Sequence, residues 1–417
     1  EVENNRKKED SEEYETYKEV VTINSRIPLW KRDKKDITEE EYNNFYTDKF
    51  YDYSAPIKVM HFNIEGNVNY TALLYIPSHA PYDYYTKEYE KGLQLYTNGV
   101  LIMDKCKDML PDYFSFVKGV IDTSDIPLNI SRETLQDDKN IKLIAKSIES
   151  KIRKELEALL KEDREKYEEF YKAFGTGIKF GIYNDYGINK DKLQDLLMFY
   201  SSKEKKLVTL KEYTERMKDK DKNIYYACGE TIEKIDMLPQ VESVKDKYEV
   251  LYLTDYVDEF AIKTLHSYND KEFVNVSSDS TDLSSEKEKK EINKINEDNK
   301  DMLSVMKEAL DSSVVEVKFT NKLKNHPACL TTEGEVSTSM EKVINAMPTD
   351  EKINAKMVLE INNNHKITEK LKDLYNKDKE EMKKYVKVIY MEARLIEGLP
   401  IDNPTEFSNL ICELISK

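Results

Sequence analysis

Apolar and polar residues alternate along three runs in the first part of the chain. The runs are IKVMHFNIEG (Ile57–Gly66), YTALLYIP (Tyr70–Pro77) and GLQLYTNGVLIM (Gly92–Met103). Alternation with period two is typical of β-strands that bury one face. The third run contains Asn98-Gly99, a dipeptide favoured in two-residue hairpin turns. Helical patches separate the runs, so this part of the chain is predicted to be a mixed α/β domain.

After Asn140 the apolar period changes to three or four residues. Lys, Arg and Glu occupy the other positions, which predicts a long amphipathic helical stretch, broken once near Asp163. Its apolar members are Ile141, Ile144, Ile148, Ile152, Leu156, Leu159, Tyr167, Phe170 and Phe174. The next residues, GTGIKFG, lack the GxGxxG spacing of a dinucleotide-binding loop. We therefore expect the helix to end at Gly175 and the glycines to form a cap and turns.

A second, smaller α/β unit is predicted after these glycines. LQDLLMFYSS (Leu193–Ser202) is expected to be helical, and NIYYACG (Asn223–Gly229) and YEVLYLT (Tyr248–Thr254) are expected to be strands. Strands that alternate with helices favour a short parallel sheet. Ser277–Asp301 is polar and is expected to be a boundary that is partly helical.

The last part of the chain is predicted to be mostly helical, with strands at Val314–Thr320 and Ala355–Asn362. Gly398 and Pro400 end one helix, and Asn403 caps the next. Two amphipathic helices at the end of a chain have little left to pack on, which favours self-association. The apolar residues predicted to form this dimer interface are Met382, Val386, Ile389, Phe407, Leu410, Ile411 and Leu414.

The amino-acid composition limits the classes of binding partner and the cellular compartment that are expected for the chain. The chain carries 65 Lys and Arg against 81 Asp and Glu, a formal net charge of -16, which argues against nucleic acid and anionic membranes as partners. Its 4 cysteines are far apart and form no CxxC pair. That pattern argues against a disulfide framework and a zinc cluster, and it favours a reducing, intracellular compartment. No apolar stretch approaches the roughly 18 residues of a transmembrane helix.

Length and the first residues bear on domain organisation. A chain of 417 residues is expected to hold two or three domains. It begins with Glu1 rather than Met, so we expect a fragment that lacks its natural N-terminus. Glu1–Glu19 is nearly all charged or polar and is expected to be a solvated tail.

No self-contained catalytic motif is present. The sequence lacks GxxxxGK[ST], HExxH and GxSxG, and its five histidines do not cluster. One loop does stand out, DIPLNISRETLQ (Asp125–Gln136), where Arg132 falls in the first turn of an expected helix. A cation is unfavourable there, typically by about 0.3–1 kcal/mol. Arg132 either points to water and pairs with a nearby carboxylate, or faces an anion such as a phosphate bound by another domain or chain.

Several segments resemble the ninety-kilodalton heat-shock chaperone family, most of all its bacterial branch. The resemblance runs from about Ile23 to the end of the chain and is most specific over Lys91–Gln136. Segments similar to the family's middle domain are Ile27–Tyr46, Leu74–Pro81, Lys91–Gln136, Leu210–Tyr226 and Val250–Phe260. His326–Val343 resembles its C-terminal dimerisation domain.

The resemblance implies an α/β and α+β fold. An α/β/α middle domain, with larger and smaller subdomains joined by a long helical stretch, precedes a mostly helical C-terminal dimerisation domain. The expected division is a charged linker (1–19), the larger subdomain with helical connector (20–175), the smaller subdomain (176–278), a polar connector (279–300) and the dimerisation domain (301–417).

In function, the resemblance implies a cytoplasmic, ATP-dependent chaperone that works as a homodimer and binds partly folded client proteins. ATP and Mg²⁺ would be bound in the intact protein by an N-terminal nucleotide domain acting in cis, and this chain alone is expected to bind no cofactor and to be inactive. In the family, an arginine of the middle-domain loop reaches the γ-phosphate of ATP. Here that arginine is Arg132, and Asn129 and Gln136 match the supporting polar positions.

The resemblance also places client-binding residues. Glu259 and Phe260 would lie on the inner face of the client cleft, with Phe260 where bacterial relatives often have Trp. Val336–Met347 resembles the amphipathic segment that lines this cleft. Its apolar stripe is Met340, Val343, Ile344 and Met347. A stripe that contains methionine suits promiscuous binding, and packing in the core is the alternative. The chain ends in ELISK rather than MEEVD, so partners that recognise the MEEVD tail are not expected.

Three interpretations follow for the chain. In the first, the chain is a client-holding and dimerising module. In the second, which is compatible with the first, it also completes the active site of the nucleotide domain through Arg132. In the third, it is an independent enzyme with an unrecognised acid–base pair. An ATP-independent holdase or scaffold that acts through a C-terminal dimer is the alternative to the ATP-driven chaperone.

Overall fold

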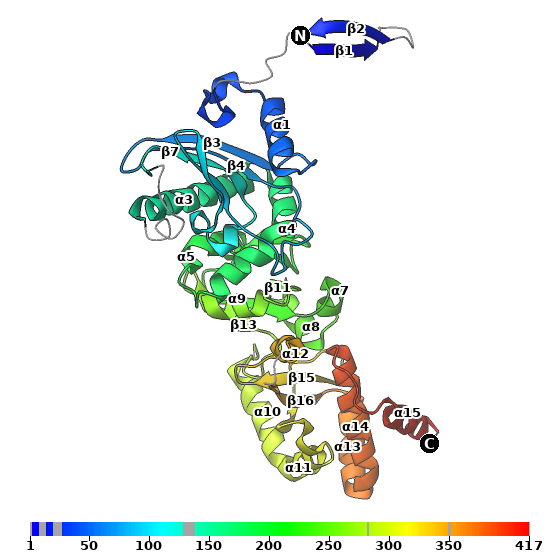
Figure 1. The fold of residues 1–417 in the computed structure, drawn as a ribbon. Helices are drawn as coiled ribbons and strands as arrows, with labels where there is room; N and C mark the ends of the chain where they lie inside the picture. The colour runs from blue at the N-terminus through cyan, green and yellow to red at the C-terminus, as the bar shows by residue number, and fades with distance from the viewer. Residues whose placement is uncertain are drawn as a thin grey trace. The chain divides into compact units, whose positions relative to one another are not determined.

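The computed structural model describes residues 2–7, 14–19, 27–127, 138–281, 283–348 and 352–416. The chain divides into two compact units, Glu1–Ala173 and Phe174–Lys417. Figure 1 shows the elements of both units in chain order. In the first unit, β1 (Val2–Lys7) and β2 (Tyr14–Glu19) pair antiparallel. The strands were not predicted, and the solvent exposure expected of this segment stays a prediction.

The first unit contains a five-stranded sheet in the order β3-β4-β7-β5-β6. Its strands are β3 (Lys58–Ile64), β4 (Tyr70–Ile76), β5 (Leu93–Thr97), β6 (Val100–Cys106) and β7 (Lys118–Thr123). Neighbours are antiparallel except β5 and β7, which are parallel. The three predicted strand runs are confirmed, and so is the Asn98-Gly99 turn, where both residues have positive φ (52° and 82°). β7 was not predicted.

Helices and short turns pack on this sheet. α1 (Glu39–Phe50) begins with a capping box between Thr38 and Glu41. The buried indole of Trp30 donates to Asp122 at 3.0 Å and packs in a cluster with Tyr46 and Tyr75. The 3-10 helices of this unit are η1 (Leu29–Lys31), η2 (Lys34–Asp36), η3 (Lys107–Met109) and η4 (Asp112–Phe114).

The long helical stretch is confirmed as α3 (Lys139–Glu162) and α4 (Arg164–Tyr183), separated at Asp163. The predicted end at Gly175 is wrong, because α4 continues for two more turns and the division between the two units falls inside it. Ile178 and Ile182 are fully buried and extend the spacing of Phe174. Burial of these side chains offsets the roughly 1 kcal/mol that each helical glycine costs.

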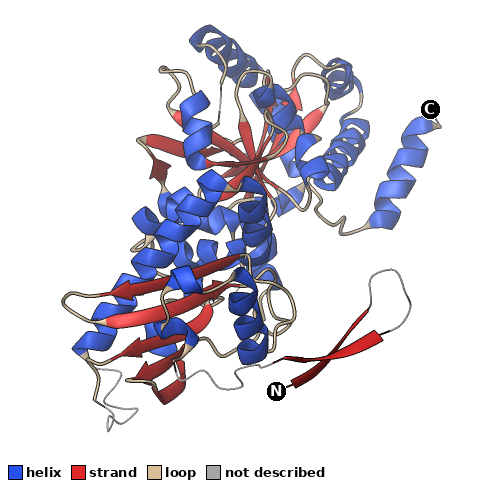
Figure 2. Cartoon of the chain, turned by 90° about the horizontal axis from the view of Figure 1, so that it is seen from above, coloured by secondary structure: helices blue, strands red, loops and turns tan. Residues whose placement is uncertain are grey.

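The second unit opens with a six-stranded sheet in the order β12-β13-β10-β11-β8-β9. Its strands are β8 (Met198–Ser201), β9 (Leu207–Thr209), β10 (Asn223–Cys228), β11 (Val250–Leu253), β12 (Ser267–Tyr268) and β13 (Lys271–Asn275). The predicted parallel pairing is confirmed for β10, which lies parallel to both β11 and β13. Figure 2 shows the strands of the sheets in red against the helices.

The prediction of a helix over Leu193–Ser202 was wrong. These residues contain the end of α5 (Lys190–Leu193), the 3-10 helix η5 (Gln194–Leu196) and strand β8, which lies between β11 and β9 in the sheet. A short apolar run that is buried on all sides does not show which period it follows. The remaining helices around this sheet are α6 (Leu210–Arg216), α7 (Ile232–Asp236), α8 (Pro239–Lys245) and α9 (Asp258–Leu265).

A three-stranded sheet follows, in the order β14-β16-β15. Its strands are β14 (Glu316–Thr320), β15 (Ala328–Glu333) and β16 (Lys356–Asn362). The predicted strands over 314–320 and 355–362 are confirmed, and β15 was not predicted. The elements around this sheet are α10 (Glu286–Asp298), α11 (Lys300–Glu308), η6 (Asp311–Ser313), α12 (Thr338–Ala346), α13 (Lys366–Lys377), α14 (Lys379–Ile396) and α15 (Pro404–Ile415).

The predicted α/β and α+β fold, with a mostly helical C-terminal region, is confirmed. The predicted end of α14 and the predicted start of α15 are also confirmed. Gly398 has φ of 67° just beyond α14, and the side chain of Asn403 accepts from the backbone N–H of Glu406 at the start of α15. The finer division of the chain into five parts stays a prediction.

Candidate functional site

The loop with the predicted catalytic residues lies outside the described residues. Arg132, Asn129 and Gln136 all fall in 128–137, and their predicted roles stay predictions. Both flanks of this loop are described. On one side Asp125 accepts from the backbone N–H of Asn69 at 2.6 Å, and on the other Asp138 caps α3.

Helix α9 carries the predicted client residues Glu259 and Phe260. The Glu259 carboxylate is only 3% exposed and accepts from Tyr226 Oη at 3.3 Å, Asn275 Nδ2 at 3.0 Å and Ser337 Oγ. Phe260 is partly exposed, and its ring lies 5.3 Å from that of Tyr183. Burial, reinforced by the charge of Glu259, raises the pKa of the Tyr226 phenol. The two neighbours therefore differ, since Glu259 bonds inward and Phe260 reaches the surface.

A buried ion pair fixes the start of α9, and sequence reasoning missed it. Lys179, in the part of α4 where turns were predicted, places Nζ 2.6 Å from Asp258 Oδ1 and 2.6 Å from Asp255 Oδ2. Burial raises the pKa of Asp258, and the charge of Lys179 opposes that shift. The only sequence signal was the spacing of Asp255 and Asp258, which is typical of a helix start. The pair ties α4 to α9.

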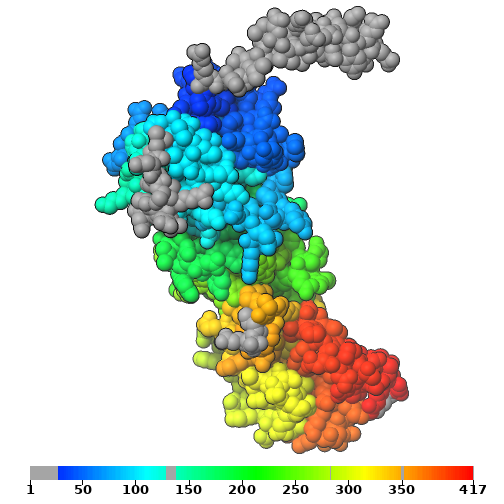
Figure 3. Space-filling view, in the orientation of Figure 1, coloured from blue at the N-terminus to red at the C-terminus, as the bar shows by residue number. Residues whose placement is uncertain are grey.

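Helix α12 carries the predicted apolar stripe. Ser337 caps it by accepting from the backbone N–H of Met340 at 3.1 Å. None of its residues is buried, since Met340, Val343 and Ile344 are partly exposed and Met347 at its C-cap is 44% exposed. Figure 3 shows the segment around α12, coloured orange, at the molecular surface. The alternative of full burial in the core does not describe these side chains.

A cavity of about 570 Å³ lies beside α12. Val343 and Met347 line it from α12, and Ile235, Leu238 and Leu253 line it from the six-stranded sheet and its helices. Most of its surface is apolar, with Lys342, Glu230 and Glu397 among the polar residues. A concave apolar surface of this size holds a few large side chains, which makes it a candidate binding site.

Glu397 is the unusual acid of this cavity. Its Oε1 accepts from Gln240 Nε2 at 2.7 Å, and its backbone carbonyl accepts from Lys342 Nζ at 2.9 Å. Burial raises the pKa of the Glu397 carboxyl to about 7. Burial also lowers the pKa of Lys342. Both shifts favour the neutral form, so the charge of this cavity responds to pH.

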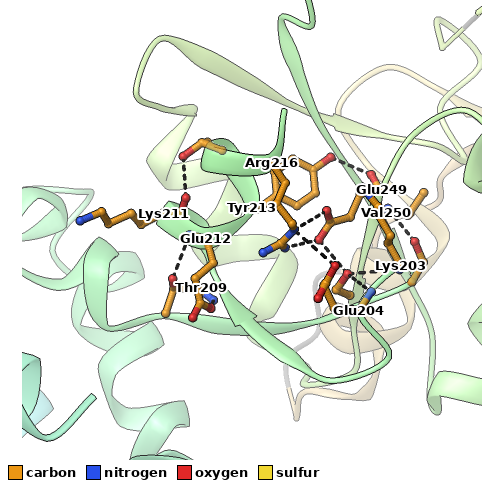
Figure 4. A network of polar contacts seen from close by, with 12 residues as sticks. Lys203, Glu204, Thr209, Lys211, Glu212, Tyr213, Arg216, Glu249 and Val250 are labelled. Carbon is orange, nitrogen blue, oxygen red and sulfur yellow. Dashed lines mark hydrogen bonds and ion pairs between the residues drawn. The ribbon is translucent and has the colours of Figure 1, made fainter. Parts of the chain in front are cut away.

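A second polar network serves the fold. Figure 4 shows Arg216 of α6 reaching Glu249, where Nε donates to Oε2 at 3.0 Å and Nη2 donates to Oε1 at 2.5 Å. The hydroxyl of Tyr213 donates to the carbonyl of Glu249 at 2.7 Å. A bidentate pair of this kind is geometrically specific. It fixes α6 against the start of β11.

The predicted dimer interface separates into two groups. Met382, Val386 and Ile389 of α14 are buried in the core of their own chain, so they contact β-strands and helices of that chain and offer no surface to a partner. The prediction that these three residues form the interface is corrected accordingly. A helical period shows which face is buried and not which chain buries it.

Helix α15 presents the other group. None of its residues is buried, and its apolar residues Phe407, Leu410, Ile411 and Leu414 are all partly exposed. Two ion pairs link it to α14, Lys384–Glu413 at 2.5 Å and Lys387–Glu406 at 3.1 Å. An amphipathic helix without a buried face is a candidate for self-association.

The described residues contain no group of three or more His, Cys, Asp or Glu side chains that could hold a metal ion. Among the same residues, no helix combines the length and apolar character needed to cross a membrane. All four cysteines are free thiols.

Comparisons with known proteins give one consistent result. The family described as "Hsp90 protein" matches residues 1–417. Chaperone protein HtpG of Clostridium botulinum (strain 657 / Type Ba4) is 54% identical over 410 residues, which is 98% of this chain and 66% of the relative. Chaperone protein HtpG of Clostridium perfringens and that of Alkaliphilus oremlandii are each 53% identical over 416 residues, covering 99% of this chain and 66% of each relative. The chain thus spans about two thirds of the length of these curated relatives.

The raised pKa of Glu397 leads to a prediction about stability and pH. Its ordinary value is 4.5 and its folded value is about 7, so the folded chain binds more protons than the unfolded chain between those pH values. The contribution of Glu397 to stability therefore falls as pH rises through this window. We expect Glu397→Gln to remove that contribution, which thermal unfolding of both proteins between pH 4.5 and 7.5 would measure.

The matched control is Glu233→Gln, at an exposed position of α7. This variant is expected to keep the pH profile of the unsubstituted protein. Parallel profiles for Glu397→Gln and the unsubstituted protein would contradict the prediction.

Proposed function

The chain belongs to the Hsp90 family, and from that premise we propose that it is the client-binding, dimerising and ATPase-completing part of an ATP-dependent molecular chaperone. Partly folded proteins are its proposed clients and a second copy of the chain is its proposed partner. ATP and Mg²⁺ would be bound in the intact cytoplasmic protein by an N-terminal nucleotide domain in cis. The observation that carries the client-binding part is the partly exposed apolar face of α12 beside the 570 Å³ cavity.

Three features of α12 support client binding. Its apolar side chains are kept partly in contact with water, which is costly unless a partner covers them at times. Two of these are methionines, whose flexible side chains adapt to different partners. The adjacent cavity adds apolar surface from a different part of the fold. A site of this kind selects exposed apolar side chains and not one sequence.

The expected affinity follows from the small apolar area involved. Each large side chain moved from water to an apolar site contributes about 1.5–3 kcal/mol, and part of that is offset by lost freedom of both partners. Three or four such contacts give weak, reversible binding, typically in the micromolar range. Weak binding suits a chaperone, because a client must leave in order to fold.

Dimerisation is proposed through α15. In the proposed dimer its face of four apolar residues meets the same residues of a second copy across a two-fold axis, which is the commonest symmetry of homodimers. The ion pairs between α15 and α14 hold the helix in place without covering that face fully.

Arg132 is proposed to stabilise the γ-phosphate of ATP, supported by Asn129 and Gln136. The support is the family membership and the position of Arg132 in the sequence, where a cation suits a bound anion. An arginine supplied from outside the nucleotide domain would neutralise charge that develops in phosphoryl transfer. An ATP-independent holdase or scaffold remains the alternative, and it predicts no dependence of client handling on Arg132.

The client site is tested by Val343→Asp. A carboxylate on the apolar face of α12 disfavours burial of that face by a client, so we expect the affinity for a non-native protein to fall about tenfold or more. The probe is fluorescently labelled, reduced and carboxymethylated α-lactalbumin, and the measurement is fluorescence anisotropy. Leu143→Asp, at a 44% exposed position of α3, is the control and should bind the probe normally. Equal affinities of both variants for the probe would contradict the proposal that α12 forms part of the client site.

The catalytic role is tested by Arg132→Ala in the intact protein. We expect ATP turnover to fall about a hundredfold or more, because one transition-state donor is lost, while dimerisation and client binding stay unchanged. Turnover is measured by phosphate release, with Arg153→Ala on α3 as a control that should keep its activity. A similar loss of turnover, dimerisation and client binding would contradict the assigned role.

The dimer surface is tested by Leu414→Asp. A charge on the apolar face of α15 is expected to raise the dimer dissociation constant at least about a hundredfold. Light scattering at micromolar concentration should give twice the mass of the chain for the unsubstituted protein and a single mass for the variant. Asn409→Asp places the same carboxylate at an exposed position of the same helix and should stay dimeric. A dimer in both variants would place the interface elsewhere.

A further inference from the structure

Two side chains of helix α9 contact the segment that leads into α12. Glu259 and Lys263 are four residues apart, and so lie on one face of α9. Glu259 accepts from Ser337 Oγ, while Lys263 Nζ donates to the backbone carbonyl of Glu335. Both contacts fall on the connection between β15 and α12, within the second compact unit. The start of α12 is therefore held from α9.

The hydroxyl of Ser337 makes two bonds at once. It donates to Glu259 and accepts from the backbone N–H of Met340 at 3.1 Å. Capping satisfies one of the free N–H groups at the start of a helix, and a donor bond to a carboxylate fixes the orientation of the capping oxygen. The negative charge of Glu259 also lies near the positive end of the α12 dipole. Glu259 thus supports α12 through Ser337.

Glu259 is itself fixed by the six-stranded sheet. Tyr226 of β10 donates to its Oε1 at 3.3 Å, and Asn275 at the end of β13 donates to the same oxygen at 3.0 Å. Both carboxylate oxygens are therefore engaged, and the residue is only 3% exposed. A client segment could reach this carboxylate only by breaking these bonds. Direct recognition of a client by Glu259 is disfavoured for that reason.

Helix α12 depends on polar contacts of this kind because it buries none of its residues. Other contacts of the helix include Glu341 with the backbone N–H of Ala355 at 2.7 Å, Lys342 with the carbonyl of Glu397 at 2.9 Å, and Asn345 with the carbonyl of Ile353 at 2.8 Å. These three act along the helix, whereas the Glu259–Ser337 bond acts at its first turn.

We infer that Glu259 is a positioning residue for client binding. It links the six-stranded sheet to the start of α12 through its hydrogen bond with Ser337. This link sets the orientation of the α12 face beside the cavity. This inference rests on the proposed client-binding function of α12. It assigns Glu259 a role that differs from the direct client contact implied by the family resemblance.

The test combines Glu259→Ala, Ser337→Ala and the double variant in the full chain. Two quantities are measured for each, the amide hydrogen exchange of residues 338–346 and the affinity for reduced, carboxymethylated α-lactalbumin. Each single variant is expected to speed exchange at α12 about tenfold and to weaken probe binding. Because both substitutions break one linkage, the double variant should be no worse than the more severe single variant.

Two further variants keep the test decisive. Ser285→Ala removes the matching cap of α10, where Ser285 and Glu288 form a capping box, and should leave α12 exchange and probe affinity unchanged. Glu259→Gln preserves the shape of the side chain and an acceptor oxygen, and should restore most of the protection of α12. It also provides a measurement if Glu259→Ala fails to fold.

Two results would overturn the inference. In the first, Glu259→Ala weakens probe binding and leaves α12 exchange unchanged, which would make Glu259 a direct client contact. In the second, the losses of Glu259→Ala and Ser337→Ala add in the double variant. Failure of the proposed function gives a different result, namely faster α12 exchange in Glu259→Ala together with normal probe affinity in Val343→Asp.

Discussion

Helix α12 is held by polar contacts near its ends and along one side, and no buried apolar face anchors it. Most helices gain their stability from an apolar face that packs on the core. In α12 that face stays partly exposed beside the cavity, so hydrogen bonds must supply the positioning. The Glu259–Ser337 bond at its start and the Lys342 bond to Glu397 further along perform this task. An uncovered face can then keep one orientation.

The parts of the second unit that carry α12 are joined by a regular set of backbone and side-chain bonds. The backbone N–H of Thr332 donates to the carbonyl of Ser277 at 3.1 Å, and the N–H of Asp279 donates to the carbonyl of Thr332 at 3.0 Å. Gln240 of α8 donates both to the carbonyl of Leu330 at 2.5 Å and to Glu397. Of these bonds, the one from Gln240 to Glu397 reaches a residue that lines the cavity beside α12.

Sequence patterns predicted the elements whose two faces differ. α3 has a regular apolar stripe, so its type and approximate limits were correct, and β3 and β4 were identified as strands although β4 is buried along almost its whole length. β8 was missed because Leu196 to Phe199 are all buried, and a uniformly buried run carries no period. The continuation of α4 was missed because local glycine preference argued against it, while the burial of Ile178 depends on the rest of the fold.

The candidate site shows the same limit. The apolar stripe of α12 could be found from spacing, since it is a property of one helix. That Glu259 would meet Ser337, 78 positions away, depends on tertiary contacts that one sequence does not reveal. The same holds for Met382, whose helical face was identified correctly but whose partner is its own chain. Spacing identifies a face, and the fold determines what covers it.

The most direct test of the account is to ask whether clients touch α12. A photo-reactive amino acid placed at position 347 would be illuminated in the presence of reduced, carboxymethylated α-lactalbumin, and cross-linked peptides would be identified by mass spectrometry. The same amino acid at position 143 of α3 serves as the reference. If clients bind α12, we expect cross-links at position 347 that an excess of unlabelled client removes, with few at position 143. Equal cross-linking at both positions, or none at position 347 while the client is bound, would contradict this expectation.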